Sequence, residues 1–293
     1  MKQYLIGLCV ATAMGCSLVG CDEDHVTYSG PDYVMFSDTL STIAIQNDDY
    51  HDVYIAATQA CDYDRTYGIE IVDKESNAIE GKHYSIESNS VTIKAGEYAA
   101  ALRIRGNYDR ITDTDSIGVT LRLINKEQTW NVYGDKARIV LRKVCPFDLN
   151  TFTRYCRVTS TYYEAHMPGV EERIIMTEPD PEEENTVILK DFFYKGYDIK
   201  LHFNTKDPLQ PQIEMEDGQV IASTAEVFGG PIGDGNLRVQ QPVNLVSYYN
   251  VCQHYVMLYF MLYAQDGDQV QTENTYLTIL EWISDAEAGA KPE

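Results

Sequence analysis

The stretch DSIGVTLRL (residues 115–123) decides the fold class, because its apolar residues recur at every second position. The alternating apolar residues are Ile117, Val119, Leu121 and Leu123. Successive side chains of a strand point to opposite faces, so this period of two indicates a half-buried β-strand. The same period recurs in SVTIK (90–94) and in DIKLHF (198–203). Long stretches of helical period are missing, and we therefore predict an all-β protein.

Two further patterns refine this prediction. Asp217-Gly218 separates QIEME (212–216) from QVIAS (219–223), and such a pair is typical of a two-residue hairpin turn, because glycine tolerates positive φ. The longest apolar run after the first twenty residues is YVMLYFMLYA (255–264). It is too short for a membrane-spanning helix, which needs about 20 apolar residues, and it predicts a buried strand.

The N-terminal half resembles the Calx-β type of immunoglobulin-like sandwich, in the variant found in Bacteroidetes lipoproteins. The segments that carry the resemblance are DRTYGIEIV (64–72), AIEGKHYSIE (78–87), VTIKAGE (91–97) and DSIGVTLRL (115–123). Short alternating strands with turn signals every ten or so residues independently favour a sandwich. The resemblance implies an immunoglobulin-like (Calx-β-like) sandwich.

Calcium-binding members of that family place an aspartate just before the corner tyrosine and further acids at one end of the sandwich. Here the position before Tyr84 is His83, a poor ligand for a hard cation that prefers oxygen. Asp109, Asp113 and Asp115 could still gather a metal in one loop. The departure at His83 favours solvated loop acids over a calcium site, and we predict no cofactor.

The C-terminal half resembles a domain that follows a Calx-β-like module in uncharacterised Bacteroidetes lipoproteins. The resembling segments are CPFDLNTFTRYCRVTSTYY (145–163), ILKDFF (188–193), GQVIAST (218–224), GDGNLRV (233–239) and SYYNVCQHYVMLY (247–259). That family has no assigned activity, so the resemblance implies architecture and location only. It adds a second antiparallel β domain, a sandwich or barrel-like structure. The predicted parts are a signal peptide (1–20), a lipidated cysteine and tether (21–32), the sandwich (33–144), the second domain (149–285) and a flexible tail (286–293).

The N-terminal residues are typical of a targeting signal. Lys2 and an apolar segment ending at Gly20 are typical of a secretory signal. Leu18-Val19-Gly20-Cys21 resembles the bacterial lipobox, which implies a lipid anchor on Cys21. The acids Asp22, Glu23 and Asp24 resemble the export signal of Bacteroidetes surface lipoproteins. We expect an outer-membrane lipoprotein that faces the cell exterior.

The net charge and the spacing of the cysteines argue against several kinds of ligand and metal site. The net charge of −22 disfavours nucleic acid and anionic lipid as ligands. Cys61, Cys145, Cys156 and Cys252 lack zinc-site spacing, and export permits a disulfide. Buried free thiols and one disulfide remain open alternatives, and Cys156 with Cys252 is the pair we expect if one forms.

No catalytic motif stands out, since HExxH, GxSxG and a phosphate-binding loop are all absent. Tyrosine is abundant, with 22 residues, and includes the pairs Tyr162-Tyr163 and Tyr248-Tyr249. If these pairs lie in strands, one member of each points outward and suits stacking on a sugar or filling a protein interface. We therefore predict a non-catalytic surface protein that binds a glycan or a partner protein. The alternatives are an extracellular glycan hydrolase with unidentified carboxylates and a structural subunit of a surface complex.

Overall fold

The structure is a computed structural model that describes residues 28, 30–114, 116–124, 129, 134–266 and 268–289. Side chains are described for all of these except 266 and 268–273. The predicted signal peptide, Cys21, the acids Asp22, Glu23 and Asp24, and Asp115 of the candidate metal set lie outside the described residues. No helix in the described part of the chain is long and apolar enough to cross a membrane.

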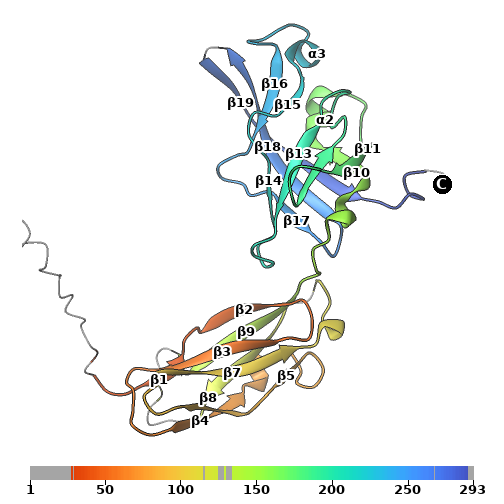
Figure 1. The fold of residues 1–293 in the computed structure, drawn as a ribbon. Coiled ribbons are helices and arrows are strands. Elements are labelled where there is room, and N and C mark those ends of the chain that lie inside the picture. Colours follow the sequence, from red (N-terminus) through yellow and green to blue (C-terminus); the bar gives the residue numbers. More distant parts are fainter. Residues whose placement is uncertain are drawn as a thin grey trace, which may run out of the picture.

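The protein is all-β, as predicted. The N-terminal unit is a sandwich of two sheets, and Figure 1 shows it below the C-terminal unit. One sheet has the order β1-β3-β7-β5 and the other β2-β9-β8-β4-β6, with only β2 and β9 parallel among these pairs. The strands are β1 (Val34–Phe36), β2 (Leu40–Ile45), β3 (Tyr50–Ala57), β4 (Arg65–Ile71), β5 (Tyr84–Ile86), β6 (Ser90–Ile93), β7 (Ala99–Gly106), β8 (Ile117–Leu123) and β9 (Lys136–Lys143). Short 3₁₀ turns are η2 (Asp73–Glu75) and η3 (Tyr108–Arg110).

The apolar side chains that alternate along the strands form the core of the sandwich. In β8, Val119, Leu121 and Leu123 are buried as their period of two predicts. Side chains from both sheets meet in a single apolar cluster, which includes Ile55 and Ile104 on one side. Burial of one face of each sheet is what holds two such sheets together.

The C-terminal unit is a closed antiparallel barrel. The hydrogen-bonded order β18-β17-β14-β13-β12-β11-β10-β19 returns to β18, and the hairpin β15-β16 extends it by pairing β16 with β18. The strands are β10 (Arg154–Ser160), β11 (Arg173–Pro179), β12 (Thr186–Leu189), β13 (Ile199–Asn204), β14 (Gln212–Glu214), β15 (Val220–Ser223), β16 (Asn236–Gln240), β17 (Tyr248–Asn250), β18 (Tyr255–Asp266) and β19 (Asp268–Trp282). The helical elements are η4 (Leu149–Phe152), α2 (Thr161–His166) and α3 (Thr224–Phe228).

Two sequence-based expectations about strands need correction. The strands on either side of Asp217-Gly218 do not pair with each other, since β14 pairs with β13 and β17 while β15 pairs with β16. The turn itself is present, with Gly218 at φ 93°. The run 255–264 is a strand but is buried on one face only, because its tyrosines and methionines face outward and are half-buried.

Residues 144–148 join the two units as an extended segment without helix or strand. The first described residues sit at the far end of the sandwich from this joint (Figure 1). There the buried Arg65 guanidinium donates to Asp32 at 3.0 Å and to the carbonyl of Gln59 at 2.9 Å. Gln59 in turn donates its side-chain amide to the carbonyl of Gly30. The start of the described chain is thereby held at one end of the sandwich, and the barrel lies at the other.

Candidate functional site

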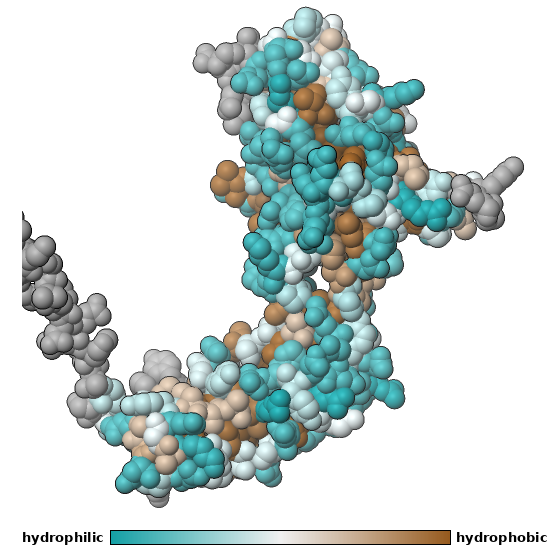
Figure 2. All heavy atoms as spheres, viewed as in Figure 1, coloured by the Kyte–Doolittle hydropathy of each residue, from teal (hydrophilic) through white to brown (hydrophobic). Residues whose placement is uncertain are grey.

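A cavity of about 480 Å³ lies where the sandwich, the joint and the barrel meet. The sandwich contributes residues at the ends of β2 and β9 and in the loop before β8, and the barrel contributes the β13–β14 loop and β17 with its flanks. This volume falls in the range of small-molecule binding sites, roughly 300–1,000 Å³. Figure 2 shows hydrophobic residues near this waist on an otherwise mostly hydrophilic surface.

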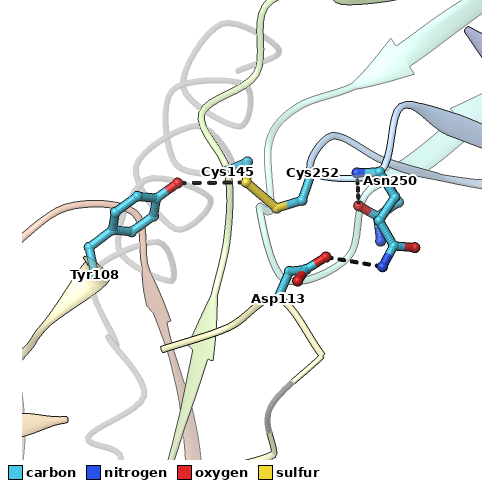
Figure 3. The surroundings of a disulfide bond; sticks show 6 residues. Tyr108, Asp113, Cys145, Asn250 and Cys252 are labelled. Atoms are coloured by element: carbon cyan, nitrogen blue, oxygen red, sulfur yellow. Dashed lines mark hydrogen bonds between the residues drawn. A yellow bond between two sulfur atoms is a disulfide. The ribbon is translucent and has the colours of Figure 1, made fainter. Parts of the chain in front are cut away.

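A disulfide forms one wall of the cavity and corrects the predicted cysteine pairing. Cys145 of the joint is bonded to Cys252 in the turn between β17 and β18, with Cα atoms 5.3 Å apart (Figure 3). Cys156, the partner expected from sequence, is free and fully buried, because its position in β10 points its side chain into the barrel core. Burial raises the pKa of the Cys156 thiol well above its ordinary value.

Three further contacts close the junction around this disulfide. Gln253 donates its side-chain amide to the Asp113 carboxylate at 3.0 Å, which joins the turn after β17 to the sandwich loop (Figure 3). Arg142 at the end of β9 donates to the carbonyl of Leu209 at 3.4 Å. The Tyr108 hydroxyl lies 3.6 Å from the sulfur of Cys145. The two units are thus tied to each other on the cavity's border.

The aromatic wall of the cavity comes from β17 and β18. Tyr248 and Tyr255 are half-buried, and their ring centroids lie 6.3 Å apart at an edge-on angle of 74°. The Tyr248 hydroxyl donates to the sulfur of Met257 at 2.6 Å, which fixes the ring. Burial raises the pKa of Tyr248, so its phenol stays neutral at ordinary pH.

The floor beneath them is apolar. Tyr249 is buried and its ring packs against Phe147, Phe152 and Phe203 at centroid distances of 5.1–6.0 Å. Its hydroxyl donates to the carbonyl of Asn204 at 3.2 Å. Tyr249 therefore supports the cavity and does not offer a stacking face.

The polar wall is rich in carboxamides and poor in carboxylates. Gln46, Gln210 and Gln212 line the cavity, and within the described part of the chain their side-chain amides have no hydrogen-bond partner. Arg142 and Lys143 stand at the sandwich side, where the Lys143 ammonium lies 4.0 Å from the ring centre of Tyr108. Asp113 is the one carboxylate among the described lining residues.

The sequence-predicted tyrosines divide between site and core. Tyr248 faces the cavity as half of its predicted pair, with Tyr249 buried behind it. Tyr162 and Tyr163 are both fully buried, contrary to the expectation that one points outward. The reason is local: the Ser160 side chain accepts a hydrogen bond from the Tyr162 amide and caps the helix α2, so the pair does not continue strand β10.

Of the candidate metal acids, Asp109 and Asp113 are described, whereas Asp115 lies outside the described residues. In the described residues no three His, Cys, Asp or Glu side chains are placed to hold a metal ion. Asp113 accepts instead from Gln253, and His83 accepts at Nδ1 from the backbone amide of Ile79 at 3.0 Å. His83 thus stabilises the corner before β5.

Sequence reasoning singled out Asp113, Cys145 and Cys252, but as a candidate metal ligand and as cysteines, not as cavity residues. It missed Gln46, Arg142 and Gln210, which are separated by up to 164 positions and carry no shared motif. It also missed Tyr255, although the tyrosine-rich run that follows the Tyr248-Tyr249 pair was a signal that could have found it.

The C-terminal part of the chain matches the model of one protein family. Residues 132–293, more than half of the chain, match the model described as "Domain of unknown function (DUF4984)". The chain belongs to the DUF4984 family. The match begins just before β9, so it includes the last strand of the sandwich, the joint and the whole barrel.

Three of the solved structures similar to this DUF4984 protein come from Bacteroides species. A protein of unknown function from Bacteroides ovatus has 13% identity and a TM-score of 0.34, with 85% of this chain and 89% of that chain covered. A multidomain protein including DUF1735 from the same species has 15% identity, a TM-score of 0.32 and coverage of 85% and 92%. An auxiliary nutrient binding protein from Bacteroides thetaiotaomicron has 13% identity, a TM-score of 0.32 and coverage of 83% and 90%. No curated protein sequence matches the chain. TM-scores of 0.34 or lower are too low for these similarities to indicate the function of this protein.

Proposed function

We propose that this DUF4984 protein is a non-catalytic, lipid-anchored surface protein that binds a glycan in the junction cavity. The observation that carries the proposal is the composition of that cavity, with Tyr248 and Tyr255 on one wall and three unpartnered carboxamides on another. Aromatic rings offer an apolar face for the CH side of a sugar ring, and carboxamides both donate to and accept from hydroxyls. A neutral polyhydroxy ligand satisfies both walls.

The same cavity disfavours hydrolysis. A glycosidase generally needs two carboxyl groups across the scissile bond, about 5–10 Å apart. Asp113 is the single carboxylate among the described lining residues, and its oxygen already accepts from Gln253. This composition supports the proposed binding role over hydrolysis at the cavity.

The anchor is proposed on the sequence Leu18-Val19-Gly20-Cys21, with Asp22, Glu23 and Asp24 as the surface-export signal. Support comes from the fold, because the described chain starts at the end of the sandwich that lies away from the cavity (Figure 1). With a lipid on Cys21, the sandwich would hold the cavity out from the outer membrane. Cys21→Ser should abolish incorporation of labelled palmitate and release the protein from the membrane fraction. Alanine at residues 22–24 should protect it from protease added to intact cells.

A glycan-array screen tests the binding proposal. The full-length protein, purified in a detergent without a sugar headgroup, should give a saturable hit with a neutral glycan. Tyr248→Ala should weaken that hit at least tenfold, since it removes one stacking wall. Tyr54→Ala is the matched control, because Tyr54 is an exposed strand tyrosine on β3 of the sandwich, outside the cavity.

Two results would contradict the proposal. One is a blank array with a correctly folded protein, which would redirect the function to a protein partner or a structural role. The other is release of free sugar from a bound glycan, which would make the protein an enzyme.

A further inference from the structure

The outward face of β18 has an unusual composition for a barrel exterior. Its side chains alternate between the core and a half-buried outer row made of Tyr255, Met257, Tyr259, Met261 and Tyr263. Antiparallel sheets usually turn polar residues toward water, so an outer row without a charge calls for an explanation. At about 3.4 Å per residue the row spans about 27 Å.

The row begins inside the junction cavity. Tyr255 lines the cavity, and its neighbour Tyr248 bonds to Met257, the next residue of the row. Cavity and row therefore form one continuous surface, in which the first tyrosine belongs to both.

The neighbours across the sheet flank the row with polar side chains on both sides and with an apolar stretch in its middle. On the β17 and β16 side, Asn250 lies opposite Tyr255, Gln240 opposite Met261 and Arg238 opposite Tyr263. On the β19 side, Ile279 lies opposite Met257 and Leu277 opposite Tyr259, whereas Glu281 lies opposite Tyr255 and Thr275 opposite Met261. Carboxamides beside an aromatic row repeat the chemistry of the cavity wall.

The loop 241–247 adds exposed apolar side chains at this edge. Val243 is 99% exposed and Val246, which also lines the cavity, is 59% exposed. Ser247 at the loop's end accepts from the Tyr259 amide at 2.9 Å, which fixes the end of the loop beside the middle of the row. Exposed apolar side chains at the edge of such a row are typical of a surface that contacts a ligand or partner.

The net charge of the protein favours one class of ligand for the outer face of β18. The net charge of −22 repels a second copy of this chain or a polyanionic glycan at long range, whereas an uncharged chain meets no such repulsion. The two cations that line the cavity are both engaged within the protein, Arg142 with the Leu209 carbonyl and Lys143 with the Tyr108 ring. The described outer side chains of β18 carry no formal charge.

We propose that the outer face of β18 continues the junction cavity as a track for an extended, uncharged oligosaccharide, whose successive sugars stack along Tyr255, Tyr259 and Tyr263. This inference rests on the proposed glycan binding and adds that the ligand is a chain of several sugars. The cavity holds one end, and the row increases affinity with each further sugar that reaches a tyrosine.

Titration with length series of neutral oligosaccharides tests the track. The probes are cello-, xylo-, manno- and malto-oligosaccharides of two to eight units, measured by calorimetry on the full-length protein. For the series that binds, the dissociation constant should keep falling beyond the shortest member that binds. Tyr259→Ala should weaken the longest member about fivefold to tenfold and leave the shortest unchanged, while Tyr259→Phe should retain wild-type affinity for both. Tyr54→Ala again serves as the control, and thermal melts confirm that each variant is folded.

The outcomes separate the two proposals. Affinity that stops rising with length, or a loss in Tyr259→Ala that is equal for short and long probes, overturns the track and leaves the cavity proposal intact. No binding of any probe by the wild-type protein, together with a blank glycan array, overturns both. A dimer that dissociates in Tyr259→Ala would show that a second copy covers the row, and would also overturn the track.

Discussion

The adjacent residues Tyr162 and Tyr163 differ in the hydrogen bonding of their hydroxyl groups. Tyr162 and Tyr163 are adjacent and both fully buried, yet only the Tyr162 hydroxyl has a described partner, the hydroxyl of Tyr194 at 3.4 Å. Burial raises the pKa of Tyr163 to about 12, and its buried hydroxyl has no hydrogen bond in the described structure. An unpaired buried hydroxyl costs about 1–3 kcal/mol.

Tyr163→Phe should therefore stabilise the barrel. Removing the unpaired hydroxyl without opening a cavity should raise the free energy of unfolding by about 1 kcal/mol, measured by urea titration. Tyr162→Phe is the matched variant and should be neutral or destabilising, because it removes a hydrogen bond. Equal effects of the two substitutions would show that Tyr163 has a partner after all.

His166 gives the barrel a dependence on pH. Its Nε2 lies 2.8 Å from the Tyr276 hydroxyl and its ring packs on Tyr162 and Phe228. Burial lowers the pKa of His166 below its ordinary value, because the charged imidazolium is disfavoured there. The folded state then binds this proton less readily than the unfolded state, so the stabilisation is present above about pH 6.5 and is lost as the pH falls through the folded pKa.

We expect the barrel to unfold at lower urea concentration at pH 5 than at pH 7.5. His166→Phe, which keeps a ring in place and cannot be protonated, should reduce that difference. An unchanged difference would assign the pH dependence to carboxylates instead. The control is His51→Phe on β3 of the sandwich, which should leave the barrel's pH dependence as it is.

Among the elements, the turn before β15 separates turn chemistry from strand pairing. Asp217-Gly218 does form a turn, with the Asp217 carboxylate accepting from the Gln241 amide at 2.7 Å and the Gly218 amide donating to Val239. The strands that follow pair elsewhere, because β18 extends past β17 and leaves an edge that the β15-β16 hairpin occupies. A local sequence pattern predicts a turn, but not which strand edge is free.

Gly218→Ala should destabilise the barrel by about 1 kcal/mol. Gly218 has φ 93°, a conformation that an alanine side chain disfavours, and an added Cβ would lie 3.3 Å from the Tyr263 hydroxyl. Gly230→Ala is the matched control, because Gly230 has no positive φ and open space around its Cβ position. Thermal melts of the two variants should differ, and identical melts would contradict the strained geometry.

For the molecule as a whole, the disulfide decides how the two units meet. Cys145 lies two residues beyond the last strand of the sandwich and is bonded across 107 positions to the turn that carries the cavity's aromatic wall. A cross-link of this length removes much conformational freedom from the unfolded chain, and the loss of such a native disulfide costs about 2–5 kcal/mol.

The double substitution Cys145→Ser with Cys252→Ser should lower the free energy of unfolding of the barrel by that amount. It should also weaken glycan binding, since the remaining described contacts between the units, such as Asp113 with Gln253, are exposed hydrogen bonds. Differential scanning calorimetry and small-angle X-ray scattering measure the two effects, the second as a broader distribution of interdomain distances. Cys61→Ser, at a free cysteine in the sandwich, is the control and should change neither.

Periodicity in the sequence was sufficient for the all-β class and for individual strands such as β8 and β13, because burial of alternate side chains is a local property of an extended chain. It also predicted that one of Tyr248 and Tyr249 points outward, but not that Tyr248 is the one. It failed for Tyr162-Tyr163, where one capping serine changes the backbone from strand to helix.

Tertiary structure alone decided the rest. The pairing of Cys145 with Cys252, the burial of Cys156 and the gathering of Gln46, Asp113 and Gln210 around one cavity depend on where strands close into a barrel and how that barrel meets the sandwich. Contacts between residues a hundred or more positions apart arise from packing of whole sheets, and short-range patterns do not encode them. The β architecture, and the anchor that we propose on Cys21, depend on local sequence patterns, whereas the cavity and the track that we propose along β18 exist only once the barrel has closed.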